Sequence, residues 1–139
     1  MFDMSDADSV LFANEAFYRA FAEGDAQAME QLWSARDDIT CLHPGWGPIF
    51  GRAEVMASWS AIFASAQMPG IGCLDPRARI HGDVAYVVCF EQLPGGRLAA
   101  TNLFAREGTV WKMILHQAGP TADGAGPAPG PGGQTGSVH

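Results

Sequence analysis

Three short turns divide the second half of this chain, and they constrain its fold more than any other feature. The turns contain glycine and lie at residues 82–83, 94–96 and 107–108. The segments beside them are rich in β-branched and aromatic residues and span residues 73–81, 84–93, 97–106 and 109–118. Turns this short join neighbouring antiparallel strands. The pattern therefore predicts a four-stranded meander.

The first half of the chain has helical periodicity instead. Apolar side chains recur every three or four residues from Val10 to Phe21, and Gly24 is suited to end that helix. Asp25 can cap a second helix, and Gly51 opens a third. Between these helices, residues 39–43 predict a short strand that ends at a loop rich in proline and glycine. Helices followed by a meander predict an α+β fold.

The length and composition indicate one domain with a tail. A chain of 139 residues fits a single domain, and 47% hydrophobic residues suffice for a core. We expect residues 1–7 to be disordered and residues 8–118 to fold. Residues 119–139, with seven glycines and four prolines, predict a flexible tail because they cannot bury enough apolar surface.

Charge and cysteine content exclude several classes of protein. Eight basic and 15 acidic residues give a net charge of −7, which argues against binding nucleic acid or an anionic membrane surface. The chain lacks the run of about 20 apolar residues that a membrane-spanning helix needs, and its start lacks the basic residues of a secretory signal. Three cysteines at irregular spacing predict reduced thiols. We therefore expect a cytoplasmic protein.

Counting back from the later turns assigns the strand side chains to two faces. Two-residue loops would place Glu91 opposite Ala100 and Asn102 opposite Met113. One face then carries Val87, Cys89, Glu91, Ala100, Asn102, Phe104, Trp111, Met113, Leu115 and Gln117. The opposite face is also largely apolar, and three helices can cover only one face. We therefore predict a homodimer through that second face, which includes Tyr86, Val88, Phe90, Thr101, Leu103, Ile114 and His116.

Glu91 is the acidic residue in the middle of a predicted strand, and it shares a face with Asn102 and Gln117. Because a buried, unpaired carboxylate is costly, its position predicts a polar pocket in an apolar interior. Burial would raise its pKa toward the range useful for a general acid or base. The alternative is a structural carboxylate paired with Arg97, Arg106 or a backbone group.

The loop after the first strand supplies a second group of candidate pocket residues. His43 ends that strand, where functional groups are common, and Cys41 faces the same way. Two ligands without a third do not make a metal site, so we expect His43 to line the pocket without a metal. Trp46, between two glycines, predicts a pocket rim. Tyr18 and Trp59 are either an aromatic wall for a flat ligand or ordinary core residues.

Two polar positions remain ambiguous at this point. Asn102 is either a hydrogen-bonding partner for a ligand or a core amide satisfied by its neighbours. His116 and Gln117 belong either to the pocket or to the dimer interface.

Several short motifs, taken in order, resemble the SnoaL-like branch of the nuclear transport factor 2-like superfamily over residues 8–120. They are AFY at 16–18, GD at 24–25, LW at 32–33, CLHPG at 41–45, GR at 51–52, SW at 58–59, GDVAY at 82–86, TNLF at 101–104 and WKMILHQ at 111–117. The resemblance implies three N-terminal helices packed in a strongly curved antiparallel or mixed sheet, a cone with a pocket at its open end. It also implies a homodimer packed through the sheet.

Members of that superfamily include isomerases, polyketide cyclases, dehydratases and epoxide hydrolases, as well as transport factors and kinase hub domains. The carboxylate, tyrosine and acid of the ketosteroid isomerases do not map onto this chain. Close relatives tend to have two histidines where this chain has His116 and Gln117. Fold and chemistry are separable, so the resemblance leaves the reaction open.

Two functions follow. The first is a protein that binds a small apolar organic molecule and, if it is an enzyme, catalyses cofactor-free isomerase, cyclase or dehydratase chemistry. Glu91 and His43 are then the catalytic residues, and the ligand contacts are Tyr18, Trp46, Trp59, Asn102 and Gln117. The alternative is a non-catalytic dimeric assembly or accessory module whose pocket is vestigial.

Overall fold

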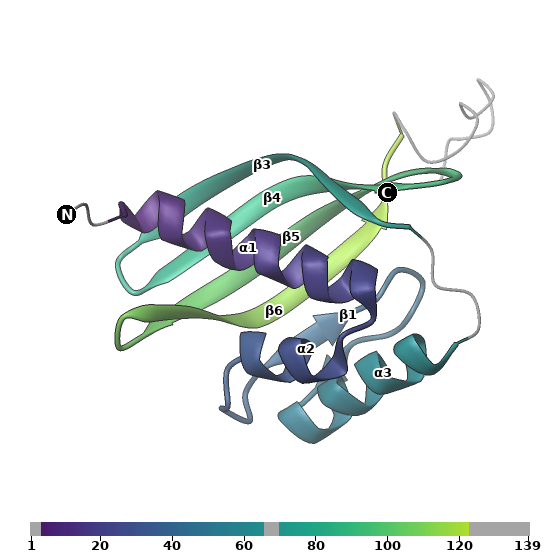
Figure 1. Ribbon diagram of the computed structural model, residues 1–139, viewed down its shortest axis with the longest axis horizontal. Helices are drawn as coiled ribbons and strands as arrows, with labels where there is room; N and C mark the ends of the chain where they lie inside the picture. The colour runs from purple at the N-terminus through teal and green to yellow at the C-terminus, as the bar shows by residue number, and fades with distance from the viewer. Residues whose placement is uncertain (1–3, 66–69, 123–139) are drawn as a thin grey trace.

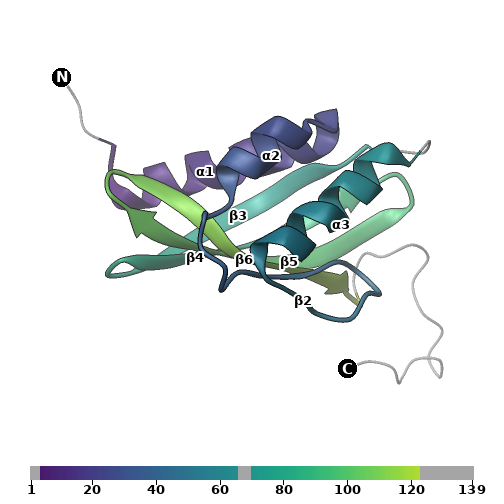
Figure 2. The ribbon, with the colours of Figure 1, turned by 90° about the horizontal axis from the view of Figure 1, so that it is seen from below.

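The computed structural model describes residues 4–65 and 70–122. Helix α1 (Asp6–Glu23) crosses the face of a six-stranded sheet, as Figure 1 shows. Helix α2 (Ala26–Leu32) packs beside α1, and α3 (Arg52–Ala64) lies near the short strands at one end of the sheet (Figure 2). None of the helices in these ranges is long and apolar enough to cross a bilayer.

Helix α1 ends at the glycine that the sequence predicts and begins four residues before the apolar stripe that starts at Val10. The Ser5 hydroxyl accepts a hydrogen bond from the Asp8 backbone nitrogen at 3.0 Å, which caps the helix. Gly24 ends it with a φ of 64°, a conformation that glycine adopts without strain. Because the helix begins at Asp6, the predicted disordered segment 1–7 is too long at its C-terminal end. Residues 1–3 lie outside the described part.

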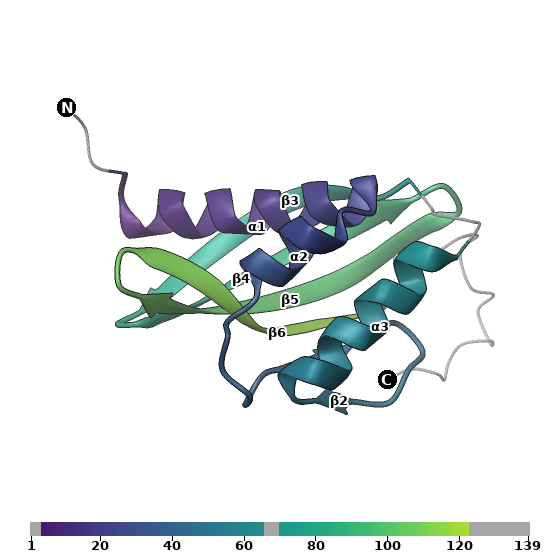
Figure 3. The same cartoon turned by 60° about the horizontal axis from the view of Figure 1, so that its bottom comes forward.

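The sheet is mixed, with the strand order β2-β1-β6-β5-β4-β3. Its strands are β1 (Thr40–Leu42), β2 (Ile49–Phe50), β3 (Gly72–His81), β4 (Val84–Leu93), β5 (Gly96–Glu107) and β6 (Val110–Pro120). Strand β1 runs parallel to β6, and the other pairs are antiparallel. The meander bends beneath α1 (Figure 3), so the predicted α+β fold with a curved mixed sheet is confirmed.

An additional strand and a longer last strand differ from the prediction. Strand β2 was not expected, because a two-residue strand inside a loop has no periodicity of its own. Strand β6 continues to Pro120, so the predicted domain end at residue 118 is two residues short. The predicted tail beyond residue 122 lies outside the described residues.

The loops of the meander are residues 94–95 and 108–109, each one position away from the predicted loop. This displacement shifts each pairing by two residues and therefore keeps the side chains on their predicted faces. Glu91 consequently pairs with Leu98 rather than with Ala100.

A bulge in β6 does change the faces. Phe104 pairs with Met113, but Leu103 pairs with Leu115, which leaves Ile114 as an extra residue. The extra residue turns His116 inward, opposite Asn102.

Four face assignments were therefore wrong. Leu115 and Gln117 lie on the outer face rather than the inner one, and His116 lies in the interior rather than on the predicted dimer face. Ile114 packs against the core instead of facing outward. All of these errors have one cause, because an inserted residue reverses the alternation of every side chain beyond it.

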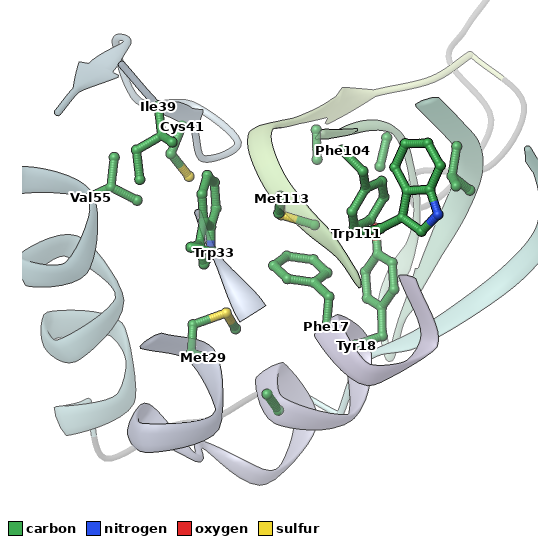
Figure 4. Close-up of a cluster of buried hydrophobic side chains, with 14 of the residues drawn as sticks. Phe17, Tyr18, Met29, Trp33, Ile39, Cys41, Val55, Phe104, Trp111 and Met113 are labelled. Atoms are coloured by element: carbon green, nitrogen blue, oxygen red, sulfur yellow. The ribbon is translucent and has the colours of Figure 1, made fainter. Parts of the chain in front are cut away.

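The core lies between the helices and the inner face of the sheet. Figure 4 shows Phe17 and Tyr18 of α1 pointing toward Phe104 and Met113 of the sheet. None of the residues that the structure describes covers the outer face of the same sheet, and Val88 in its middle is 45% exposed.

Candidate functional site

Glu91 lies on the inner face of β4 and is only 1% exposed. The Tyr18 hydroxyl, which comes from α1, donates a hydrogen bond to Glu91 Oε2 at 2.7 Å. Burial raises the pKa of Glu91 to about 7, because the interior penalises the charged form, and the Tyr18 hydrogen bond offsets part of that rise. The carboxyl group therefore changes its protonation state near neutral pH.

The arginines considered as structural partners of Glu91 are engaged elsewhere. Arg106 pairs with Asp6 at 2.8 Å and with Asp83 at 3.2 Å, both at the surface. The Arg97 guanidinium lies over an aromatic ring, 4.8 Å from its centroid. Neither arginine therefore pairs with Glu91, and the predicted alternative of a structural ion pair with Arg97 or Arg106 is wrong.

Asn102 connects the carboxyl group to three other polar side chains. Its amide nitrogen donates to Asn14 Oδ1 at 2.9 Å and to Tyr18 Oη at 3.1 Å. Its amide oxygen is 2.6 Å from His116 Nδ1. Since an amide oxygen only accepts, His116 Nδ1 is the donor and carries the proton of the neutral imidazole. Both ends of the Asn102 amide are used, as in a satisfied core amide.

His116 therefore presents Nε2 as an acceptor to the interior. This nitrogen is buried, has no hydrogen-bond partner among the described residues, and lies 3.8 Å from Glu91 Oε2. Burial, together with the nearby His43, lowers the pKa of His116 to about 3. When this pair holds a single proton, that proton consequently resides on the carboxyl group, and His116 is neutral.

His43 follows β1 and belongs to a neighbouring cluster. Ser58 uses its hydroxyl proton on the Val55 carbonyl at 2.7 Å, so His43 Nε2 is the donor to Ser58 Oγ at 2.9 Å. Burial lowers the pKa of His43 to about 4, which keeps it neutral. Its ring lies 6.4 Å from that of His116. His43 is thus near the site, but His116 is the histidine that faces Glu91.

The other predicted ligand contacts lie in different environments. Trp59 is buried and packs against His43, with ring centroids 4.7 Å apart, and its indole nitrogen has no partner among the described residues. Trp46 is 49% exposed and lies 4.9 Å from His43. Gln117 points away from Glu91 and Asn102, so the prediction that it shares a face of the sheet with these two residues is wrong.

A groove between α1 and β3 approaches this polar network from outside. Its volume is about 590 Å³, and Asn14, Tyr18 and Cys73 are among its lining residues. Asn14 and Tyr18 also make the hydrogen bonds described above, so the groove and the network share side chains. Glu91 lies behind Tyr18 when approached from the groove.

The cysteine and histidine at the end of β1 remain a pair. Cys41 Sγ lies 3.6 Å from His43 Nε2, and burial raises the pKa of Cys41 to about 12, so it remains a thiol. Across residues 4–65 and 70–122, no group of three or more histidine, cysteine, aspartate or glutamate side chains is placed to hold a metal ion.

Sequence reasoning missed Asn14 and misplaced His116. Asn14 had a detectable signal, because it lies four residues from both Val10 and Tyr18 on the apolar side of α1. A polar side chain in that position must find a buried partner. His116 had no comparable signal, since its inward position depends on the bulge in β6.

Comparison with known proteins gives consistent results. Residues 10–123 match the family model of the SnoaL-like domain. A crystal structure from Streptomyces avermitilis, provisionally described as a dehydratase of the NTF2-like family, is 33% identical with a TM-score of 0.77, over 84% of this chain and 96% of that chain. Another from Thiobacillus denitrificans, provisionally described as a calcium/calmodulin-dependent protein kinase type II association domain, is 30% identical with a TM-score of 0.72, over 78% and 92%.

A curated plant protein also matches. F-box protein SKIP8 of Arabidopsis thaliana is 28% identical over 110 residues, which is 78% of this chain. The chain spans about half of that protein, 48% of its length.

Proposed function

This chain belongs to the SnoaL-like domain family, and from that premise we propose that it binds a small organic molecule and catalyses cofactor-free acid–base chemistry with Glu91. One observation supports the proposal above all. Glu91 is a buried carboxyl group with a pKa raised to about 7, it accepts a hydrogen bond from Tyr18, and it faces His116 Nε2, which has no partner in the described part of the chain. Perturbed carboxyl groups of this kind are frequent at sites of proton transfer.

The chemistry needs a base that takes a proton and an acid that returns it. Ionised Glu91 accepts the proton removed from a carbon beside a carbonyl group, and the electron pair of the broken C–H bond moves into an enolate. Returning the proton to another carbon gives an isomer, whereas transferring it from Glu91 to a β-hydroxyl group, whose C–O bond breaks as the enolate electrons form the C=C bond, releases water and gives a dehydration product. His116 Nε2, which only accepts, orients the protonated carboxyl group.

Tyr18 is the proposed route between a substrate and Glu91. Its side chain lines the groove beside α1, and its hydroxyl bonds the carboxyl group at 2.7 Å. A proton released in the groove therefore passes to Glu91 through the Tyr18 hydroxyl, which receives one proton as it gives another. The dehydratase description of the relative from Streptomyces avermitilis makes dehydration one reaction of this type to test.

Deuterium exchange tests this function without knowledge of the natural substrate. In D₂O, the protein should exchange the methyl protons of acetonaphthone, with a rate that rises with pH and levels off above about 7. Glu91→Gln should lower the rate by about 10²-fold or more, whereas Glu54→Gln, at an exposed position on α3, should not change it. Two results would refute the proposal. One is deuterium exchange that persists in Glu91→Gln, and the other is a wild-type protein that exchanges the protons of none of a panel of aromatic and aliphatic ketones.

A second candidate function, assembly through the sheet, is favoured by the outer face. Val88 and its neighbours Tyr86, Phe90 and Leu103 form an apolar surface that nothing in residues 4–65 and 70–122 covers. The relative from Thiobacillus denitrificans is described as an association domain. We propose that this surface, with Thr101, forms a homodimer interface.

Native mass spectrometry tests the interface independently of any chemistry. The wild-type protein should be dimeric, and Val88→Lys should be monomeric because the lysine charges the middle of the apolar surface. The control is Ala57→Lys, at an exposed position on α3. A monomeric wild type, or a dimer that tolerates Val88→Lys, would show that this face is not the interface.

A further inference from the structure

Helix α1 and strand β3 lie side by side (Figure 1), and the groove that they border has the size and the walls of a small-molecule site. Its volume of about 590 Å³ is typical of such sites. Leu11 and Phe12 of α1 form one wall, and Ile71 and Pro76 form the other. Phe12 is 62% exposed at the rim, so a ligand lying in the groove would cover an apolar surface that is now in contact with solvent.

Strand β3 is irregular where it borders the groove. Its pairing with β4 shifts register between Leu74 and Arg77. Within this bulge Asp75 has a φ of 54°, which is rare for residues other than glycine, and Pro76 cannot donate a backbone hydrogen bond. Bulges of this kind are over-represented beside functional sites, where they redirect side chains. The wall of the groove is therefore shaped by a local distortion of the edge strand.

The floor of the groove holds an amide donor with a weak partner. Asn14 is buried, and its Oδ1 accepts from Asn102 at 2.9 Å. Its Nδ2 donates to Cys73 Sγ at 3.6 Å, and a thiol sulfur is a poor acceptor. An oxygen atom in the groove would be a better acceptor for this donor than the sulfur.

The rim of the groove selects against anions. Asp8 and Glu15 lie on it, and Arg19, which also lines the groove, pairs with Glu15 at 3.5 Å. The rim therefore carries an excess of negative charge on a chain whose net charge is −7. Together with the donor on the floor, this favours a neutral ligand that presents an acceptor oxygen.

We infer that this groove binds a neutral, elongated carbonyl compound. Its apolar part lies against Leu11, Phe12 and Ile71, and its carbonyl oxygen replaces Cys73 Sγ as the acceptor of Asn14 Nδ2. The inference names the substrate class of the proposed acid–base site and relies on that proposal for the reaction, but not for binding. Tyr18, on the same floor, then lies between the bound carbonyl compound and Glu91.

Prodan, a neutral and elongated naphthyl ketone, is the probe for this inference. Its fluorescence should show saturable binding with a shift to shorter wavelength, and anilinonaphthalene sulfonate, an anion, should bind at least tenfold more weakly. Bound prodan should also protect Cys73 from iodoacetamide, as measured by peptide mass. Cys41 and Cys89 are buried and should stay unmodified with or without the probe, which makes them internal controls.

Two modifications place the probe in the groove. Ala22→Trp fills the groove from an exposed position on α1 and should weaken prodan binding at least tenfold, whereas Ala57→Trp on α3 should not weaken it. Wild-type protein carrying carboxamidomethylated Cys73 should also fail to bind prodan. This modified protein replaces Ala22→Trp as the test if that variant does not fold. Absence of saturable binding, binding that leaves Cys73 unprotected, stronger binding of the anion, or binding unaffected by either modification would overturn the inference.

Glu91→Gln separates this inference from the proposed chemistry. The variant should bind prodan as tightly as the wild type, because Glu91 does not line the groove among the described residues. In the wild-type protein, prodan binding without exchange chemistry leaves the groove in place and removes the catalytic proposal, whereas exchange chemistry with no prodan binding removes the groove alone.

Discussion

Replacing Glu91 by glutamine should stabilise the protein at alkaline pH and have little effect on its stability at acid pH. The carboxyl group is buried, and its pKa is raised from 4.5 to about 7. Glutamine has the shape of the protonated acid. Its oxygen can accept from Tyr18, and its amide can point at His116 Nε2, which only accepts. The variant therefore imitates a wild-type protein that never loses this proton.

The size of the effect follows from the difference between the folded and unfolded pKa values. Below about 4.5 both states of the wild type hold the proton, and above about 7 neither does. Between these values the folded state holds a proton that the unfolded state has released, so stability falls as the pH rises. The shift from 4.5 to about 7 corresponds to about 3 kcal/mol of unfolding free energy.

Two histidines change the unfolding free energy with pH in the opposite direction. Their effect must be the same in the wild type and in the variant for the comparison to isolate Glu91. The pKa values of His43 and His116 are lowered to about 4 and about 3, so each contributes stability that is present above pH 6.5 and is lost as the pH falls through its folded pKa. Both histidines are present in the wild type and in Glu91→Gln. The difference between the two proteins therefore isolates the carboxyl group.

Urea unfolding followed by tryptophan fluorescence measures this difference. At about pH 5 the two proteins should differ by less than about 1 kcal/mol, and at about pH 8.5 the variant should be more stable by about 3 kcal/mol. Glu54→Gln, at an exposed position, should show no such dependence. A gap between wild type and Glu91→Gln that stays constant with pH would mean that Glu91 titrates alike in both states, and the reasoning about its burial would fail.

Three further predictions concern the side chains around Glu91. Tyr18→Phe removes a hydrogen bond that lowers the pKa of Glu91, so carbon-13 NMR should show this carboxyl group titrating at a higher pH than in the wild type. Asn102→Leu leaves several buried polar groups without partners and should cost about 2–4 kcal/mol in urea unfolding, whereas Gln117→Leu, on the exposed side, should cost less than about 0.5 kcal/mol. Nitrogen-15 NMR should find His116 neutral and protonated on Nδ1 at about pH 5, and an imidazolium there would contradict the hydrogen-bond assignment.

The elements of this fold were predictable where their signals are local. The stripe that starts at Val10 and the glycine at position 24 define α1 within a few residues. The turns of the meander could be read directly, because the residues that permit tight turns are few. The α+β class then follows from the order of the elements, and none of these steps requires knowledge of contacts between distant residues.

Register was harder to predict, because it depends on interactions between strands. The structure has its two-residue loops at 94–95 and 108–109. The sequence around each loop is equally compatible with a turn one position away, and local turn preferences do not choose between the two. The error was harmless in both cases because it shifted the pairing by two. The bulge at Ile114 was not harmless, since an isoleucine in an apolar strand gives no sign that it is left unpaired.

The candidate site was predictable only in part, for the same reason. Glu91 was found because a single acid in an apolar strand is conspicuous and must have a partner. Its partner Tyr18 was predicted to be either an aromatic wall for a ligand or a core residue, since nothing in α1 indicates which strand residue its hydroxyl reaches. Predicting the series of hydrogen bonds from Asn14 through Asn102 to His116 requires the distances between α1, β5 and β6.

The bulge in β6 determines what chemistry the interior can offer. Without Ile114 as an extra residue, the alternation would turn Leu115 and Gln117 toward Glu91 and place His116 outside. With it, the imidazole enters the interior, and Asn102 holds its proton on Nδ1. Each polar atom of the Asn102 amide is satisfied, but His116 Nε2 has no partner among the described residues, so this nitrogen is not explained as part of a closed structural network. A buried acceptor left open beside a carboxyl group that titrates near neutrality is a costly arrangement for a purely structural core, and a role in proton transfer accounts for both groups together.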